Sequence, residues 1–313
     1  MKTLTAKVGD VLIGGGNPIV VQTMCNTHTY DVEATVAQCV RLRDAGAEII
    51  RITVPGPADV EHIKEIKRRL RELGVSTPIV ADIHFSSQTA IMVAPFVEKV
   101  RINPGNFHKD HEEARRQFAQ LIDVCRENGT AIRIGVNHGS LGNTPEAMAK
   151  AAMEWLGMCE KADFHNVVVS LKSSNTVVMV EAYRRLMSAM KDNGVIYPLH
   201  VGVTEAGNGD SGRIKSCVGI SALLSEGIGD TVRVSLTEEP EAEIPVAVYL
   251  AERYGHRIVS SMTSMSVNGR KAVARYDSPS RETLLLDVSC DFGKRLLDKS
   301  LDGLEIDGTY LDD

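Results

Sequence analysis

Five short apolar runs of the chain each carry a basic residue close to their end. These runs are Ile50 to Thr53 with Arg51, Val100 to Asn103 with Arg101, Ile132 to Gly135 with Arg133, Ser170 to Lys172 with its terminal lysine, and Val232 to Ser235 with Arg233. A cation inside a segment built for burial is costly unless an anionic group meets it. The recurrence therefore predicts one shared anion, bound by basic side chains that converge from five segments.

Amide and hydroxyl side chains lie near four of these cations at even spacing. The pairs are Arg101 with Asn103, Arg133 with Asn137, Lys172 with Ser170, and Arg233 with Ser235. Residues an even number apart in a strand point to the same face. Arginine can contact two phosphate oxygens at once and lysine adds a point charge, so the pattern predicts a site for a small, highly charged phosphate ester.

Two other segments offer groups for acid-base or ligand-orienting work. Asp82 and His84 project to the same side of one run, and Glu205 follows another. A purely structural, hydrogen-bonded role stays equally open for His84.

Internal ion pairing is the alternative use of the five cations. For any single arginine, a carboxylate between the layers of the fold is as good an explanation as a ligand. Only Asp82, Glu205 and Asp230 occupy comparable positions in the sequence. We therefore expect that the cations are not all neutralised from within.

The elements that position these residues alternate regularly along the chain. An apolar, β-branched run followed by an amphipathic helical segment occurs eight times between about Pro18 and Arg253. This repetition predicts an α/β fold of the (β/α)8 TIM-barrel type, whose sites lie at the carboxyl ends of the strands. An open doubly wound sheet agrees less well with the sequence, because no G-x-G-x-x-G motif follows a predicted strand.

Composition restricts the classes of partner. The formal net charge is −6, which does not suit binding to nucleic acid or to an anionic membrane. The sequence has neither a long apolar run nor a signal-peptide pattern, so we expect a cytoplasmic location. Its six cysteines contain no Cys-x-x-Cys pair, which predicts reduced thiols and no closed metal site.

The last part of the chain departs from this period. We expect a substrate-binding barrel over residues 1–255 and a short C-terminal extension over residues 256–313. The extension is too short for an independent α/β domain.

Six motifs, in order along the chain, resemble those of one enzyme family, 4-hydroxy-3-methylbut-2-enyl diphosphate synthase. The motifs are Val20-Val21-Gln22-Thr23-Met24, Val80-Ala81-Asp82-Ile83-His84-Phe85, Arg101-Ile102-Asn103-Pro104-Gly105-Asn106, Arg133-Ile134-Gly135-Val136-Asn137, Gly202-Val203-Thr204-Glu205-Ala206-Gly207, and Gly227-Ile228-Gly229-Asp230-Thr231-Val232-Arg233-Val234-Ser235. The resemblance runs from about residue 3 to residue 255.

The resemblance implies an oxidoreductase of isoprenoid precursor biosynthesis, in the methylerythritol phosphate pathway. It implies conversion of 2-C-methyl-D-erythritol 2,4-cyclodiphosphate at a 4Fe-4S cluster, ferredoxin or flavodoxin as electron donor, and a homodimer. It also implies that the phosphates are held by Arg51, Arg101, Arg133, Lys172, Arg233 and Ser235. The reacting end would then be lined by Asn137, Asp82, His84 and Glu205, with Glu205 as a proton donor or hydroxyl-orienting group.

One departure from the family concerns the cluster. The family's cluster domain carries a Cys-x-x-Cys pair, a third cysteine and a ligating glutamate, which the sequence after Cys217 does not supply. The extension resembles the domain that the longer variety of the family inserts after the barrel. We therefore expect residues 256–313 to be a linker and a remnant of that domain, the C-terminal 4Fe-4S domain to be absent, and this chain alone to bind substrate without reducing it.

Two other functions stay open. A pterin-binding barrel of the dihydropteroate synthase kind also has polar strand ends, but it needs one phosphate pocket, whereas five cations suit two phosphates. The second alternative is a non-catalytic binding or scaffold remnant, which the missing cysteines allow.

Overall fold

The structure is a computed structural model that describes residues 2–137 and 144–255, together with short strands between residues 266 and 306. The chain divides into two compact units, Met1–His256 and Arg257–Asp313. The described strands of the second unit are β11 (Ser266–Val267), β12 (Arg270–Lys271), β13 (Ala274–Tyr276), β14 (Thr283–Leu284) and β15 (Leu304–Ile306). Most of residues 256–313 lies outside the described residues, so the interpretation as a linker and domain remnant stays a prediction.

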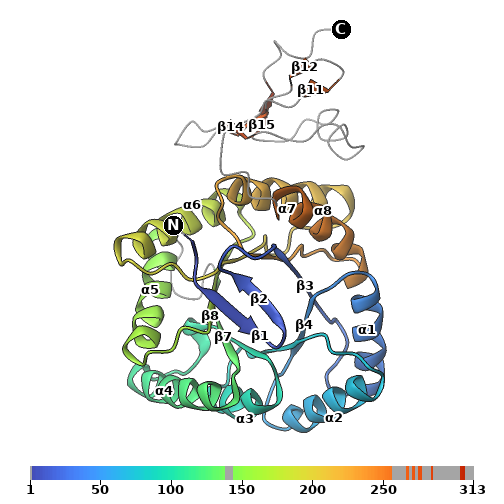
Figure 1. Cartoon of the computed structure of the whole chain (residues 1–313), viewed down its shortest axis with the longest axis vertical. Helices are drawn as coiled ribbons and strands as arrows, with labels where there is room; N and C mark the ends of the chain where they lie inside the picture. Colours follow the sequence, from blue (N-terminus) through green and yellow to red (C-terminus); the bar gives the residue numbers. More distant parts are fainter. Residues whose placement is uncertain are drawn as a thin grey trace. The chain divides into compact units, whose positions relative to one another are not determined.

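The first unit is built on eight parallel strands, which confirms the predicted (β/α)8 barrel (Figure 1). Their order around the barrel is β8-β7-β6-β5-β4-β3-β10-β9, and a parallel bridge between Val169 and Leu199 links the two ends. The strands are β3 (Val20–Met24), β4 (Ile49–Thr53), β5 (Ile79–Asp82), β6 (Lys99–Ile102), β7 (Ala131–Asn137), β8 (Val167–Lys172), β9 (His200–Val201) and β10 (Thr231–Val232).

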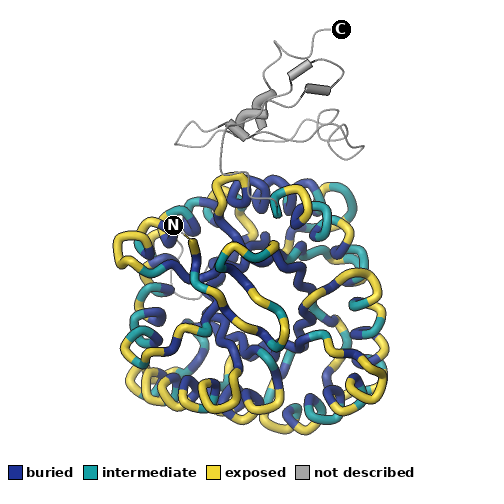
Figure 2. The backbone as a smooth tube through the Cα atoms, in the orientation of Figure 1, coloured by how far each residue is buried: buried dark blue, intermediate teal, exposed yellow. Residues whose placement is uncertain are grey.

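Helices surround the strands in a ring (Figure 1). They are α1 (Val32–Asp44), α2 (Asp59–Glu72), α3 (Ser87–Val93), α4 (His111–Asn128), α5 (Pro145–Lys161), α6 (Thr176–Asp192), α7 (Gly209–Ser225) and α8 (Ile244–Gly255), with 3-10 turns η1 (Ala94–Phe96), η2 (Pro104–Asn106) and η3 (Pro240–Glu243). The strands are buried on both faces, which explains their continuous apolar sequences, whereas the helices turn exposed residues outward (Figure 2). No helix within the described ranges combines the length and apolarity needed to cross a membrane.

An antiparallel hairpin, β1 (Thr5–Val8) and β2 (Val11–Gly14), lies across the centre of this ring (Figure 1). Its residues Ala6, Val8 and Ile13 are fully buried and pack into one apolar cluster with the first inward-facing residues of the strands, which are Val20, Ile49, Val80, Ala131 and Val168. The hairpin therefore closes the amino-terminal end of the barrel. Polar residues follow one or two steps further along the same strands, toward the opposite end.

Candidate functional site

Strand register brings the predicted cations to one level of the barrel. Asp82 is paired with Arg101, and Arg101 is paired with Arg133 on the next strand. Four residues further along β7 than Arg133, Asn137 is paired with Lys172. Paired residues of parallel strands point to the same side. The basic side chains from different strands therefore converge on the barrel lumen.

Asp82 is the centre of the most strongly connected group. Its carboxylate is buried and lies 3.3 Å from Nε of Arg51, and it accepts a hydrogen bond of 3.2 Å from Nη1 of Arg101. The same carboxylate lies 3.0 Å from Nε2 of His84. One acidic side chain thus holds two guanidinium groups and an imidazole in fixed positions.

The charges of this group follow from its surroundings. Burial would raise the pKa of Asp82, but the nearby Arg51 and Arg101, with His84 and Arg133, hold it well below its usual range. Burial lowers the pKa of Arg51 to about 10, against the attraction of Asp82. Both groups are therefore ionised at neutral pH, and Asp82 acts here as an anchor for cations rather than as a proton donor.

Gly135 makes room for Arg101. A Cβ atom at this glycine would lie 2.6 Å from Nε of Arg101, which is far inside van der Waals contact. The arginine crosses the strand at this point and donates to the backbone oxygen of Gly135 at 3.3 Å and to Oδ1 of Asn137 at 3.4 Å. Gly135 on β7 therefore provides the space that the Arg101 side chain of the neighbouring strand β6 occupies.

Arg133 is buried with donors that lack acceptors. Its side chain is 1% exposed, and its Nε and Nη1 have no hydrogen-bond partner among the described residues. Lys172 lies nearby in the lumen, and a Cβ at Gly202 would come within 3.3 Å of its Nζ. Burial lowers the pKa of Lys172 well below its ordinary value, and Arg133 and Arg51 lower it further. These groups are the clearest sign that positive charge exceeds negative charge among the described residues of the lumen.

Arg233 has a carboxylate partner that sequence reasoning missed. Its Nε and Nη2 each lie 3.3 Å from an oxygen of Glu243, a buried residue at the end of η3. Glu243 also accepts from the backbone N-H of Leu236 at 3.0 Å. The residue lies in a short 3-10 turn ten positions after Arg233, where no strand pattern draws attention to it.

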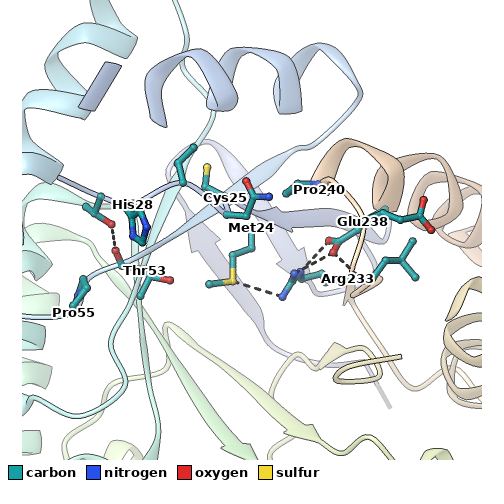
Figure 3. Close-up of a pocket in the computed structure, with 13 residues that line it drawn as sticks. Met24, Cys25, His28, Thr53, Pro55, Arg233, Glu238 and Pro240 are labelled. Atoms are coloured by element: carbon teal, nitrogen blue, oxygen red, sulfur yellow. Dashed lines mark hydrogen bonds and ion pairs between the residues drawn. The ribbon is translucent and has the colours of Figure 1, made fainter. Parts of the chain in front are cut away.

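Met24 lies between two of the cations. Its sulfur accepts hydrogen bonds from Nη2 of Arg51 at 2.7 Å and from Nη1 of Arg233 at 3.6 Å (Figure 3). The thioether is a weak acceptor, so it separates the two guanidinium groups without neutralising either.

A pocket of about 390 Å³ opens beside Met24 and Arg233 (Figure 3). Its walls combine uncharged side chains with the arginine and two acids. The lining residues are Met24, Cys25, Asn26, Thr27, His28, Thr29, Thr53, Pro55, Arg233, Leu236, Glu238, Pro240 and Glu243. Of the predicted binding residues, only Arg233 lines this pocket, and the other cations lie deeper in the lumen.

The remaining predicted residues lie at the same end of the barrel but make weaker connections. Glu205 is exposed and has a left-handed backbone, with φ of 51°, in the turn after β9. Asn103 is buried, and its Oδ1 accepts from the backbone N-H of Gly105 at 3.1 Å. Ser235 accepts a backbone hydrogen bond of 3.2 Å from Ala206. The side chain of His84 is 45% exposed, and besides Asp82 it contacts the ring of Phe85, with 5.9 Å between the ring centroids.

A second polar layer lies below the cations, and sequence reasoning missed its Lys99. Lys99 is fully buried, and its Nζ is 3.3 Å from Oε1 of Gln22. His200 is fully buried, with both ring nitrogens lacking a partner in the described part of the chain. Asp230, which we had considered as a counter-charge, instead binds Oγ1 of Thr3 and the backbone N-H of Leu199. It fastens the N-terminal segment and the start of β9.

The described residues do not fit an iron-sulfur cluster. Five cysteines, namely Cys25, Cys39, Cys125, Cys159 and Cys217, are buried thiols. Within the described ranges, no group of three or more His, Cys, Asp or Glu side chains is arranged to hold a metal ion. We therefore derive no chemical step through a cluster from these residues.

Comparison with known proteins gives two close relatives. 4-Hydroxy-3-methylbut-2-en-1-yl diphosphate synthase (flavodoxin) from Parabacteroides distasonis is 47% identical over 289 residues, which cover 83% of this chain and 47% of that protein. The ferredoxin enzyme of the same name from Synechococcus sp. (strain CC9605) is 46% identical over 281 residues, covering 82% of this chain and 71% of that protein. The chain spans about half the length of the flavodoxin-named relatives that it matches.

Solved structures show a likeness of fold alone. Dihydropteroate synthase from Stenotrophomonas maltophilia aligns with a TM-score of 0.58 at 14% identity, over 83% of this chain and 100% of that chain. Sialic acid synthetase from Leptospira borgpetersenii aligns with a TM-score of 0.56 at 13% identity, over 84% of this chain and 94% of that chain. These barrels differ in function, so the alignment with dihydropteroate synthase does not favour a pterin site here.

The family comparison is more specific than the fold. The model of the GcpE TIM-barrel domain matches residues 3–248, which include all of the predicted site residues. Together with the two relatives, this match establishes that the chain belongs to the GcpE family, whose members carry the name 4-hydroxy-3-methylbut-2-en-1-yl diphosphate synthase.

Proposed function

We propose that this chain is the substrate-binding barrel of a 4-hydroxy-3-methylbut-2-enyl diphosphate synthase. Its ligand is 2-C-methyl-D-erythritol 2,4-cyclodiphosphate, and its place is in isoprenoid precursor biosynthesis. The observation that carries the proposal is the buried Arg133, whose Nε and Nη1 have no acceptor among the described residues, in a lumen that holds several other cations. A phosphate group supplies the oxygen atoms that these donors need.

The roles of the residues follow from their contacts. Arg51, Arg101, Arg133, Lys172 and Arg233 bind the phosphate oxygens, with Asn103 and Ser235 at the rim. Asp82 and Glu243 hold three of the guanidinium groups in position. The two phosphates can then occupy different parts of the lumen, because Met24 separates Arg51 from Arg233.

The reacting end of the ligand would face Asn137, His84 and Glu205. The Asp82 carboxylate, 3.0 Å from Nε2, orients the His84 ring beside the proposed position of the ligand. Glu205 lies in a strained turn between two backbone hydrogen bonds, Thr204 to Ser173 and Ala206 to Ser235. This arrangement supports a role for Glu205 in orienting a hydroxyl or donating a proton.

Reduction of the ligand would need an electron donor. The names of the relatives give flavodoxin or ferredoxin as the electron donor of those proteins, and we propose the same class of donor here. The 4Fe-4S cluster, the homodimer and the cytoplasmic location remain predictions from the family and the sequence.

Calorimetric titration with the cyclic diphosphate tests the proposal. We expect saturable binding to the full chain with one site per barrel. Binding of a pterin diphosphate in its place, with no heat from the cyclic diphosphate, would contradict it. Binding of neither compound would favour a scaffold remnant.

A further inference from the structure

Lys99 is a buried cation beneath the proposed phosphate site. It lies two residues before Arg101 on β6, so the two side chains point to the same face and their Cα atoms are about 6.6 Å apart. The register pairs Lys99 with Val80 and Ala131, which belong to the apolar cluster that closes the barrel. The lysine thus rises from the apolar floor toward the cations of the lumen.

The surroundings of Lys99 are poor in negative charge. Its Nζ has one described partner, the amide oxygen of Gln22 at 3.3 Å, although an ammonium group has three donors. No carboxylate forms an ion pair with it in the described part of the chain. Among the described residues, the charged and titratable groups that face the lumen around Lys99 are Arg101 of the same strand and, from the other strands, Arg51, Asp82, Arg133, Lys172, His200 and Arg233.

The balance of charge in the lumen decides which group gives up its proton. Two carboxylates, Asp82 and Glu243, face six basic side chains among the described residues. A guanidinium keeps its charge at neutral pH, whereas a buried amine readily loses its proton. Burial lowers the pKa of Lys99 well below its ordinary value, and Arg133 and Arg51 lower it further. In the absence of an anion, the two buried amines of the lumen, Lys99 and Lys172, are the groups best placed to be neutral.

We propose that Lys99 forms the floor of the anion site and takes up a proton when a diphosphate enters the lumen. The negative charge of the ligand offsets the repulsion from Arg133 and Arg51, so the ammonium form becomes favourable at the moment of binding. Protonation of Lys99 should increase the affinity for a diphosphate more than the affinity for a monophosphate, because the diphosphate carries more negative charge. The inference rests on the proposed function and adds a specificity-determining residue to its site.

Calorimetry with inorganic pyrophosphate in two buffers tests the proposal. The titration uses the full chain in two non-phosphate buffers of different ionisation enthalpy at one pH, and the difference in heat reports the protons exchanged. On binding pyrophosphate, the wild-type chain should take up about one proton more than the Lys99→Met variant. Proton release from the anion itself is the same for both proteins and cancels in the comparison.

Affinity and stability provide further readouts. Lys99→Met should weaken pyrophosphate binding about tenfold and orthophosphate binding by less. The same variant should raise the melting temperature of the free protein, because it removes an amine that is protonated in the unfolded chain but disfavoured in the fold. Lys67→Met is the matched control: Lys67 is also buried but pairs with Glu98 on the outside of the barrel at 2.5 Å. It should leave proton uptake unchanged.

The outcomes separate the two proposals. If the wild-type chain and Lys99→Met bind pyrophosphate with equal affinity and equal proton exchange, the assignment of Lys99 is wrong while the anion site stands. If neither protein binds pyrophosphate, the anion site is wrong and both proposals fall. If Lys99→Met does not fold, Lys99→Gln takes its place in the comparison. The number of protons exchanged when the wild-type chain binds pyrophosphate is then also decisive. If that number equals the protons lost by pyrophosphate alone, the inference is overturned.

Discussion

Asp82 carries more of the site than its single negative charge suggests. It contacts Arg51, Arg101 and His84 at once, and each of these comes from a different position around the lumen. An ion pair of this kind is costly to break on one side, because the partners stay buried and unpaired. The carboxylate therefore acts as a structural centre for groups that are proposed to contact the ligand.

Asp82→Asn should destabilise the barrel by about 3 to 5 kcal/mol at pH 7, measured by urea unfolding. The pKa of Asp82 is depressed in the fold, so its contribution is present above the unfolded pKa of about 3.9 and is lost as pH falls through the folded value. The difference between wild type and variant should thus shrink below about pH 4. An equal difference at pH 7 and pH 3 would argue against this origin.

A surface ion pair provides the control for this change. Asp123 contacts Arg126 at 2.8 Å, with both side chains about half or more exposed. Asp123→Asn should alter stability by about 1 kcal/mol or less.

Arg133→Ala tests the residue that is proposed to need an anion most. We expect the affinity for the cyclic diphosphate to fall by about 1.5 to 3 kcal/mol, the range for one charged hydrogen bond. Titration calorimetry measures this loss, with Arg116→Ala on the exposed face of α4 as a control that should bind normally. Wild-type affinity in Arg133→Ala would remove this residue from the site.

At the scale of elements, the strands place the site and the glycines shape it. Gly135 on β7 lets Arg101 of β6 cross the lumen, and Gly202 after β9 leaves space for Lys172 of β8. Both glycines serve a side chain from a neighbouring strand. A sequence pattern that treats each strand separately does not reveal these contacts.

Gly135→Ala should weaken diphosphate binding by displacing Arg101, since the added Cβ would lie 2.6 Å from its Nε. We expect a loss of about 1 to 3 kcal/mol in stability as well, from overpacking. Gly157→Ala in α5 is a matched control, because a Cβ there meets nothing within 4 Å. It should stabilise the helix by about 0.5 to 1 kcal/mol and leave binding unchanged. Equal affinity in the two variants would show that Arg101 does not depend on this space.

Alternating strands and helices were sufficient to predict the barrel, because eight buried strands leave a strong periodic pattern. The same pattern placed Arg51, Arg101 and Arg133 on a common face. Lys99 was missed because the strand was expected to begin at Val100, whereas β6 begins one residue earlier. Glu243 was missed because its role depends on how η3 folds back on β10, which no local spacing encodes.

At the scale of the whole molecule, net charge and local charge have opposite signs. The chain carries −6 overall, yet its lumen gathers basic side chains around few acids. Many of the described acidic residues lie on the outer helices, and some of them form surface ion pairs such as Arg68 with Glu65. The overall charge therefore hides the anion site.

Metal analysis of the purified chain tests the prediction that this chain binds the substrate but does not hold the iron-sulfur cluster. We expect the full chain to bind the cyclic diphosphate but to contain no stoichiometric iron or sulfide after anaerobic reconstitution. The physical reason is that the five described cysteines are buried in the barrel unit and form no ligand group among the described residues. A complete cluster on this chain would show that its thiols had been misinterpreted.

The hairpin of β1 and β2 limits how a ligand can enter and leave the site. Because it closes the amino-terminal end, a ligand held at the mouth must leave through the face by which it entered. Any partner that covers that face must lift away before a bound ligand departs. Release of the ligand would then depend on an opening step, which can be slower than the events at the site itself.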